Sequence, residues 1–282
     1  MSKPGVGFKH LMVAIDDSEA GRNAARFAAC LADGIGAELT VLSVFPGSPD
    51  NAGGRTALDD LQAMLGREIF ARHPLLPLEL AVARGVPQVE IPRFAERAKV
   101  DLIILGRKSR SRVTRVVLGD TADAVVRRSR LPTLLVPSPQ VSLHRMLVAL
   151  DGTDRGVAVL RTAAVLGKAA DLDLTVMTVE PAGAGHPSLP STRRERLAGV
   201  VEDRLKDGTR EESNGRWQTS TSSLRVREGD VVEAILAEVE DVGADIVVTG
   251  FHPGGPLLVI DQGSVSRRLL HAVPCAVLTV PL

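Results

Sequence analysis

The chain has 282 residues, of which 44% are hydrophobic, so it is long enough for about two domains with substantial cores. Lysine plus arginine and aspartate plus glutamate both number 34, which excludes a general electrostatic attraction to nucleic acid or acidic membranes. Aromatic residues make up only 2%, which argues against proteins that bind single-stranded nucleic acid by base stacking.

The first ten residues, MSKPGVGFKH, contain no apolar segment typical of a secretory signal. No apolar run approaches the roughly 18 residues that a membrane-spanning helix needs, so we expect a cytoplasmic protein with no membrane partner. The two cysteines, Cys30 and Cys275, lie in apolar stretches, and we expect both to be buried as small hydrophobic residues. The histidines have no metal-ligand spacing, so no metal site is predicted.

From the N-terminus, short apolar runs alternate with amphipathic segments. Residues 11–15 (LMVAI) and 38–45 (ELTVLSVF) predict strands, the first of them buried on both faces. Ser18 is a favourable N-cap for the alanine-rich helix expected at about 19–33. The next expected elements are a helix near 56–72, strand 78–83, a helix that follows Gly85 and runs to about Lys99, strand 101–105, a helix from about Gly119 and strand 133–136.

The second half repeats this order. Residues 10–46 pair with 145–181 at a constant offset, and 13 of the 37 pairs are identical; residues 83–137 pair with 227–281. We infer a tandem duplication into domains 1–140 and 141–282, with an insert around 182–216. The expected elements of the second domain are strands at 146–150, 172–179, 222–227, 245–249 and 276–280, and helices near 154–170, 192–212, 229–242 and from 263.

This alternation predicts an α/β fold with two doubly wound, Rossmann-like domains and right-handed crossovers. Ligands of such sheets bind at the carboxyl ends of the strands. Asp16 and Gly106 should therefore share one rim, and Asp151 and Gly250 another. Residues 245–266 (DIVVTGFHPGGPLLVIDQGSVS) have the order strand, glycine-bearing loop and helix start, which can bind phosphate through the unpaired N–H groups of a helix N-terminus.

These residues resemble the universal stress protein family. The likeness rests on a first strand that ends in aspartate, as in DGTD at 151–154, on the glycine loop ahead of Gly-Ser, and on the closing CAVLTV strand at 275–280. It covers nearly the whole chain twice. The resemblance implies a five-stranded parallel sheet of order 3-2-1-4-5 in each domain, with helices on both faces, and pairing of the two domains through their fifth strands. It also implies a role in the stress response and, as in some members, binding of ATP with Mg²⁺.

The family's nucleotide signature is G-x2-G-x9-G-[ST]. In the second domain its first glycine and its closing Gly-Ser pair are present, while Pro253, which has no N–H, stands at the second glycine, with Gly254 next. The resemblance therefore implies a nucleotide site with these residues: Asp151, Val179, Gly250, His252, Gly254, Gly263, Ser264 and Val265.

The first domain departs further from the signature. Ser109 replaces the second glycine, and Asp120 replaces the closing Ser or Thr, where its carboxylate would repel a triphosphate. The resemblance implies a weaker site here, formed by Asp16, Val44, Gly106, Arg107, Gly119 and Thr121. In both domains the aspartate could instead cap the turn between strand and helix.

Three functions stay open. The first is a stress-response regulator that binds ATP mainly in the second domain and signals through conformation or assembly, including a possible homodimer. The second is a nucleotide-free scaffold whose basic loop at 107–115 (RKSRSRVTR) meets an anionic partner; this loop could equally be a solvated segment balanced by Asp120 and Asp123. The third is an enzyme, but no catalytic constellation surrounds His252, and the first loops (DDSEAG and DGTDRG) lack the S-G-G-x-D-S pattern of pyrophosphatase relatives. We therefore predict no catalytic residues and at most slow ATP hydrolysis.

Overall fold

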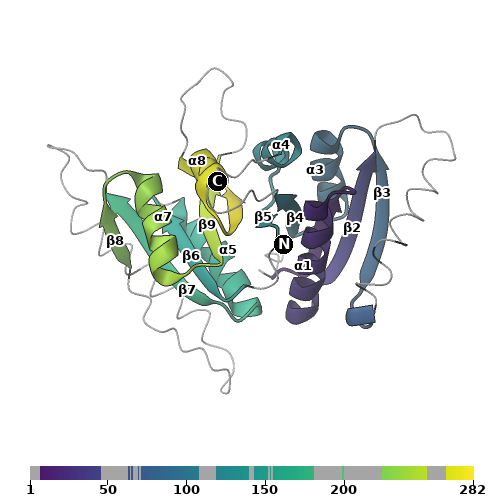
Figure 1. The fold of residues 1–282 in the computed structure, drawn as a ribbon, viewed down its shortest axis with the longest axis horizontal. Helices are drawn as coiled ribbons and strands as arrows, with labels where there is room; N and C mark the ends of the chain where they lie inside the picture. Colours follow the sequence, from purple (N-terminus) through teal and green to yellow (C-terminus); the bar gives the residue numbers. More distant parts are fainter. Residues whose placement is uncertain are drawn as a thin grey trace, which may run out of the picture. The chain divides into compact units, whose positions relative to one another are not determined.

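The structure, a computed structural model, divides into two compact units, with main spans Met1–Ser142 and Leu143–Phe251; Ile260–Val280 belongs to the second (Figure 1). The expected helices near 56–72 and 192–212 lie almost wholly outside the described residues. The described residues are 7–45, 63, 65, 69, 71–107, 119–139, 143–151, 153, 155–180, 199, 224–252 and 265–282.

The first unit has a five-stranded sheet of order β3-β2-β1-β4-β5, and its paired strands run parallel. This is the predicted order 3-2-1-4-5. The strands are β1 (His10–Ile15), β2 (Glu38–Phe45), β3 (Leu78–Arg84), β4 (Leu102–Arg107) and β5 (Thr133–Pro137). The helices are α1 (Glu19–Ile35), α3 (Pro87–Arg97) and α4 (Asp120–Arg128).

The second unit repeats the arrangement, with its strands in the order β8-β7-β6-β9-β10. The strands are β6 (Arg145–Leu150), β7 (Asp173–Glu180), β8 (Arg225–Glu228), β9 (Ile246–Phe251) and β10 (Ala276–Pro281). The helices are α5 (Gly156–Ala169), α7 (Val231–Val242) and α8 (Val265–Ala272). The predicted fold class, two tandem doubly wound domains, is therefore confirmed.

The helices cover both faces of each sheet. In the first unit the chain steps from β1 to β2 in one direction and from β3 to β4 in the other. Right-handed crossovers then place α1 and α3 on opposite faces. The strands between them are shielded from solvent on both faces. Leu11, Met12 and Val13 are all 0% exposed, although successive side chains point to opposite faces. Such burial explains why these strands are apolar throughout rather than alternating.

Each unit fixes its central strand pair with an aspartate just before the fourth strand. The Asp101 carboxylate accepts hydrogen bonds from the backbone N–H groups of Lys9 and His10 at 2.8 and 2.9 Å, where β1 begins. Asp245 accepts two equivalent bonds at the start of β6, at 2.9 and 3.0 Å. This pair is identical in the sequence repeat, and its role in both units is to hold the first strand against the fourth.

Helix ends differ slightly from the predicted bounds. α1 extends to Ile35 because Gly36, with φ 68°, supplies the left-handed residue that ends it. α5 begins at Gly156 rather than near 154, and α3 ends at Arg97. In the part of the chain that the structure describes, no helix is long and apolar enough to span a membrane.

The prediction that both cysteines are buried is wrong. Cys30 is exposed and Cys275 is half-buried. Cys30 lies in an alanine-rich run, but a helix sorts its residues by angle rather than by neighbourhood. Phe27 and Leu31 face the core, whereas Cys30 shares the exposed face of α1 with Asp33, three residues further on.

Candidate functional site

The strand register of the first unit brings its predicted site residues to one edge. Ile15 lies opposite Ser43, so the next residues, Asp16 and Val44, stand side by side at the carboxyl ends of β1 and β2. The register of β1 with β4 brings Gly106 to the same rim. The sequence prediction of a shared rim for Asp16 and Gly106 therefore agrees with the register.

The second unit has the same arrangement. Leu150 lies opposite Thr178, which places Asp151 beside Val179. Ala149 lies opposite Thr249, so Gly250 continues β9 at the same carboxyl edge. Three predicted residues, one from each central strand, are thus brought together at this rim.

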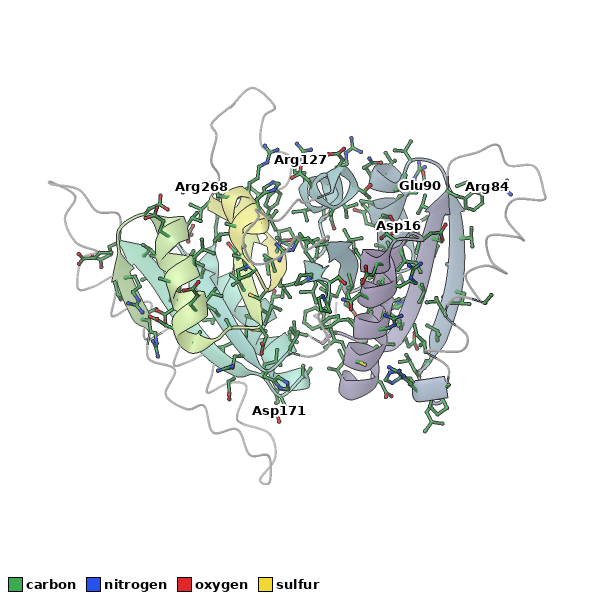
Figure 2. The ribbon with its side chains drawn as sticks, viewed as in Figure 1. Asp16, Arg84, Glu90, Arg127, Asp171 and Arg268 are labelled. Carbon is green, nitrogen blue, oxygen red and sulfur yellow. The ribbon has the colours of Figure 1, made fainter. Side chains whose placement is uncertain are left out.

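Both rim aspartates cap the turn that follows them. The Asp16 carboxylate accepts hydrogen bonds from the backbone N–H of Ser18, at 3.1 Å, and from its hydroxyl, while Ser18 Oγ caps α1 by accepting from the N–H of Gly21. Figure 2 labels Asp16 beside α1. The Asp151 carboxylate accepts from the N–H and hydroxyl of Thr153 at 2.9 and 2.7 Å. Both aspartates are exposed, so capping is compatible with contact to a ligand.

A residue that the sequence analysis missed connects α8 to this rim. The hydroxyl of Ser266, in the first turn of α8, donates a 2.6 Å hydrogen bond to the backbone carbonyl of Gly250, in β9. The bond brings the start of the helix to the carboxyl end of the fourth strand. In the repeat the corresponding residue is Ala122, which has no hydroxyl. A hydroxyl residue just inside the helix of the glycine loop was the signal that could have identified it.

The two fourth helices begin with different charges. The first turn of α4 carries Asp120 and Asp123, and Asp123 pairs with Arg127 at 2.9 Å. The described first turn of α8 has no acidic residue and contains Arg267 and Arg268. A helix N-terminus is partially positive, and carboxylates at α4 neutralise this charge. Two carboxylates therefore oppose an added anion at the start of α4, whereas the described first turn of α8 carries two arginines, of which Arg268 pairs with Asp230 at 3.1 Å.

The glycines of the signature have different roles. A Cβ built at Gly106 would lie 2.3 Å from the carbonyl oxygen of Ala20, so this glycine allows α1 to pack on β4. A Cβ at Gly250 would lie 2.5 Å from a methyl group of Leu282. At Gly119, by contrast, no described atom lies within 4 Å of such a Cβ, and φ is −66°. Backbone packing therefore explains Gly106, whereas at Gly250 the neighbour is the end of a side chain that can move, and at Gly119 no described neighbour needs the space.

The remaining predicted site residues are placed only in part. Arg107 is fully buried, His252 is exposed just after β9, and Thr121 and Val265 are half-buried in the first turns of their helices. Gly254, Gly263 and Ser264 lie outside the described residues, as do Pro253, Ser109 and the basic loop beyond Arg107.

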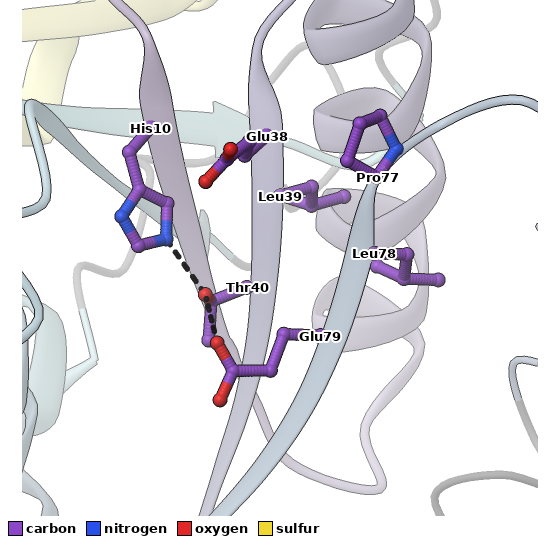
Figure 3. A pocket seen from close by; sticks show the side chains of 7 residues that line it. All are labelled: His10, Glu38, Leu39, Thr40, Pro77, Leu78 and Glu79. Carbon is purple, nitrogen blue, oxygen red and sulfur yellow. Dashed lines mark hydrogen bonds between the residues drawn. The ribbon is translucent and has the colours of Figure 1, made fainter.

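A hollow of about 320 Å³ lies at the opposite edge of the first sheet (Figure 3). There His10 Nε2 lies 2.7 Å from Thr40 Oγ1, and that hydroxyl lies 3.5 Å from a carboxylate oxygen of Glu79. The hollow is formed where β1, β2 and β3 begin, so it is separate from the carboxyl rim. None of the predicted nucleotide residues lines it: its lining residues are His10, Glu38, Leu39, Thr40, Pro77, Leu78 and Glu79.

Comparison with known proteins gives consistent matches. The model of the universal stress protein family matches residues 7–137 and again residues 142–281. A universal stress protein of Methanocaldococcus jannaschii is 28% identical over 47% of this chain and 84% of its own length; one from Thermus aquaticus is 29% identical over 46% and 98%. The crystal structure of a universal stress protein from Archaeoglobus fulgidus aligns over 96% of this chain and 98% of its own, with a TM-score of 0.72 and 19% identity.

Proposed function

The chain belongs to the universal stress protein family, in which it is a tandem member, and we propose that it is a stress-response regulator that binds ATP with Mg²⁺ mainly in its second unit. The hydrogen bond between Ser266 and Gly250 is the observation that carries the location of this site. It joins the start of α8 to the strand end beside Asp151, so groups suited to the two ends of a nucleotide lie on one rim.

The chemistry of the rim fits a nucleotide. The exposed carboxylate of Asp151 would accept hydrogen bonds from the hydroxyl or amino groups of a nucleoside. Its neighbour Val179 would offer an apolar contact to the base. The N-terminus of α8, with its N–H groups and the cation Arg267, would bind the phosphates. Mg²⁺ would enter with the phosphates and offset part of their negative charge.

The first unit is the poorer candidate for the same ligand. Asp16, Val44 and Gly106 share a rim as their counterparts do, but Asp120 and Asp123 occupy the helix start where phosphates would bind. Repulsion between such carboxylates and a triphosphate costs about 1 kcal/mol or more for each close, partly screened pair. The proposed stoichiometry is therefore one ATP per chain.

Signalling would operate through conformation or assembly. β5 and β10 stand at the ends of their units' strand orders and are rich in apolar side chains. Pairing these strands within the chain would cover two apolar edges. ATP binding would signal by stabilising this strand pairing or a homodimer interface. We propose a cytoplasmic location and at most slow ATP hydrolysis.

The test is calorimetric titration of the full chain with ATP and Mg²⁺, together with mass spectrometry of any ligand released when the purified protein is denatured. Asp151→Ala should weaken ATP binding by about tenfold or more, because it removes a charge-assisted hydrogen bond worth about 1.5–3 kcal/mol. Its matched control, Asp16→Ala, removes the equivalent aspartate of the first unit and should leave the affinity within about twofold.

Two ATP molecules per chain, or equal losses in the two variants, would contradict the assignment to the second unit. If ATP does not bind in the titration and the denatured protein releases no nucleotide, the ATP proposal fails. The scaffold that uses the basic loop at 107–115 then becomes the leading alternative. Replacing Lys108, Arg110 and Arg112 with glutamate and measuring partner capture would then test that alternative.

A further inference from the structure

Three side chains with complementary acid–base properties meet on the exposed face of α1, away from the nucleotide rim. They are Cys30 and Asp33, one helical turn apart, and His73, which lies in the segment before β3. Cys30 lies 12 residues after the Ser18 cap, which corresponds to about 18 Å along the helix. This group of three is called the Cys30 cluster below.

The ring of His73 connects the other two members. Its Nδ1 lies 2.8 Å from a carboxylate oxygen of Asp33, and its Nε2 lies 3.6 Å from the sulfur of Cys30. Because the cysteine and the carboxylate contact opposite nitrogens of one ring, the three side chains do not converge on a common centre, as the ligands of a metal ion would. The order is instead nucleophile, base and orienting acid.

Backbone hydrogen bonds hold His73 in place. Its N–H donates to the carbonyl of Ile69 at 2.8 Å, and its carbonyl accepts from the N–H of Leu76 at 3.2 Å. The His73 side chain is only 14% exposed, while that of Asp33 is 48% exposed and Cys30 is exposed. The base is therefore sheltered and oriented, whereas the sulfur is open to reagents from solvent.

We propose that Cys30 is a reactive thiol and a site of oxidation by hydroperoxides, with His73 as its base and Asp33 as the residue that orients the base. Asp33 accepts a hydrogen bond from the Nδ1–H of His73, which leaves Nε2 as the acceptor for the thiol proton. Proton transfer gives a thiolate beside an imidazolium, and the thiolate is the nucleophilic form of cysteine.

The oxidation balances with the peroxide as the only co-reactant. The Cys30 thiolate attacks one peroxide oxygen, and the O–O bond breaks. The leaving oxygen takes the proton held by His73, so for hydrogen peroxide it departs as water. Sulfur is oxidised to a sulfenic acid, the peroxide is reduced, and His73 returns to its neutral form.

The surrounding charges make the base necessary. Cys30 is five residues before the end of α1, so the helix N-terminus gives it no help and the C-terminal dipole is too far to oppose it strongly. Among the described residues, the other charged side chains within one turn of the cluster along the chain are Arg26 on α1 and Arg72 beside His73, and both are exposed to screening solvent. A protonated His73 is therefore the positive charge in contact with the sulfur.

The second unit does not repeat this arrangement. At the repeat offset of 135 residues, the counterparts of Cys30 and Asp33 are Val165 and Lys168, which cannot act as nucleophile and orienting acid. The Cys30 cluster is thus specific to the first unit, which is the unit with the poorer nucleotide rim. The inference does not depend on ATP binding in either unit.

The experiment measures the rate of Cys30 alkylation by iodoacetamide in the full chain with Cys275→Ser as background. At pH 7, Cys30 of the protein with an intact cluster should be alkylated at least about tenfold faster than Cys30 of a His73→Gln variant, because His73 takes up the thiol proton. His144→Gln, a change at an exposed histidine of the second unit, should leave the rate unchanged.

A second measurement identifies the product. Hydrogen peroxide followed by dimedone should label Cys30 in the background protein and label it several-fold less in His73→Gln, with Asp33→Asn in between. Circular dichroism melting checks that the variants fold, and labelling of Cys30 in urea checks that they carry a competent thiol. Equal alkylation rates in folded native and His73→Gln proteins would overturn the proposal, as would the absence of a dimedone adduct in the background protein.

Discussion

Gly106 packs so closely on the start of α1 that a Cβ at this residue would lie only 2.3 Å from the carbonyl oxygen of Ala20. The obstacle is backbone, which cannot rotate away as a side chain would. Gly106→Ala should therefore reduce the stability of the first unit by about 1–3 kcal/mol. Urea unfolding followed by circular dichroism would measure this loss.

The same substitution at Gly34 is the control. Gly34 lies within α1, and no described atom comes within 4 Å of a Cβ built there. Gly34→Ala should leave stability unchanged or raise it by up to about 1 kcal/mol, since alanine favours the helix. Equal stability of the two variants would show that α1 and β4 are not in close contact at Gly106.

Asp245 accepts two backbone N–H bonds where β6 begins, as Asp101 does for β1. Asp245→Ala leaves both N–H groups without this acceptor and should cost about 1–2 kcal/mol. Asp173→Ala is the matched control, because Asp173 is exposed and its hydrogen bond to the carbonyl of His144 uses its backbone. Thermal unfolding should show a lower Tm for the first variant and little change for the second; equal Tm values would contradict the role of the aspartate.

Asp230 makes stability depend on acid pH. Its carboxylate accepts two 3.1 Å hydrogen bonds from Arg268 and also caps α7 through the N–H groups of Val232 and Glu233. The bond from Arg268, and then the bond from Glu233, hold the pKa of Asp230 below its ordinary value. A carboxyl with a lowered pKa contributes stability above its unfolded pKa and loses it as pH falls through the folded pKa.

The window for this loss is therefore below about pH 4. Asp230→Asn keeps a favourable N-cap but removes the charge. Native protein should have the higher Tm at pH 6, and the difference should close as pH falls from 4 to 2. A difference that stays constant over this range would show that the charge of Asp230 does not contribute. Added salt should also reduce the difference at pH 6.

Glu238 is a fully buried acid whose two carboxylate oxygens accept from Arg225 at 2.8 Å and from Arg227 at 2.7 Å. These bonds join α7 to β8. Glu238→Gln keeps the size of the side chain but removes its charge and one acceptor, and should destabilise the second unit by about 1–3 kcal/mol. Glu240→Gln, at an exposed residue of the same helix, should change the urea midpoint little. A comparable shift in both variants would show that burial of Glu238 has no effect.

The fold was predictable because the strands are buried on both faces. Runs such as residues 11–15 and 146–150 are apolar throughout, and both halves of the internal repeat have the same succession of strands and helices. The order of the strands within each sheet was implied by the resemblance to the family. The wrong prediction for Cys30 has a simple cause, since composition was considered without the helical period that places this residue on the outer face.

Of the candidate site, the sequence predicted only which residues share the carboxyl rim of each sheet. A glycine in a sequence shows that a Cβ is missing, but not whether a backbone or a ligand needs the space. At Gly106 the carbonyl of Ala20 occupies it, whereas around Gly119 the described surroundings are open. The hydroxyl of Ser266 at the start of a helix was a usable sequence signal, but its partner, the carbonyl of Gly250, depends on how α8 is positioned against β9.

The pairing of β1 with β4 also bears on how the protein emerges from the ribosome. Leu11 pairs with Leu102, which is 102 − 11 = 91 residues later in the chain. At roughly 5–20 residues per second, synthesis of that interval takes about 5–20 seconds. During this time one edge of β1 has no native neighbour and is open to pairing with other nascent chains. Early packing of α1 on β1 would shorten the exposure of this apolar strand, and a similar interval separates β6 from its partner β9.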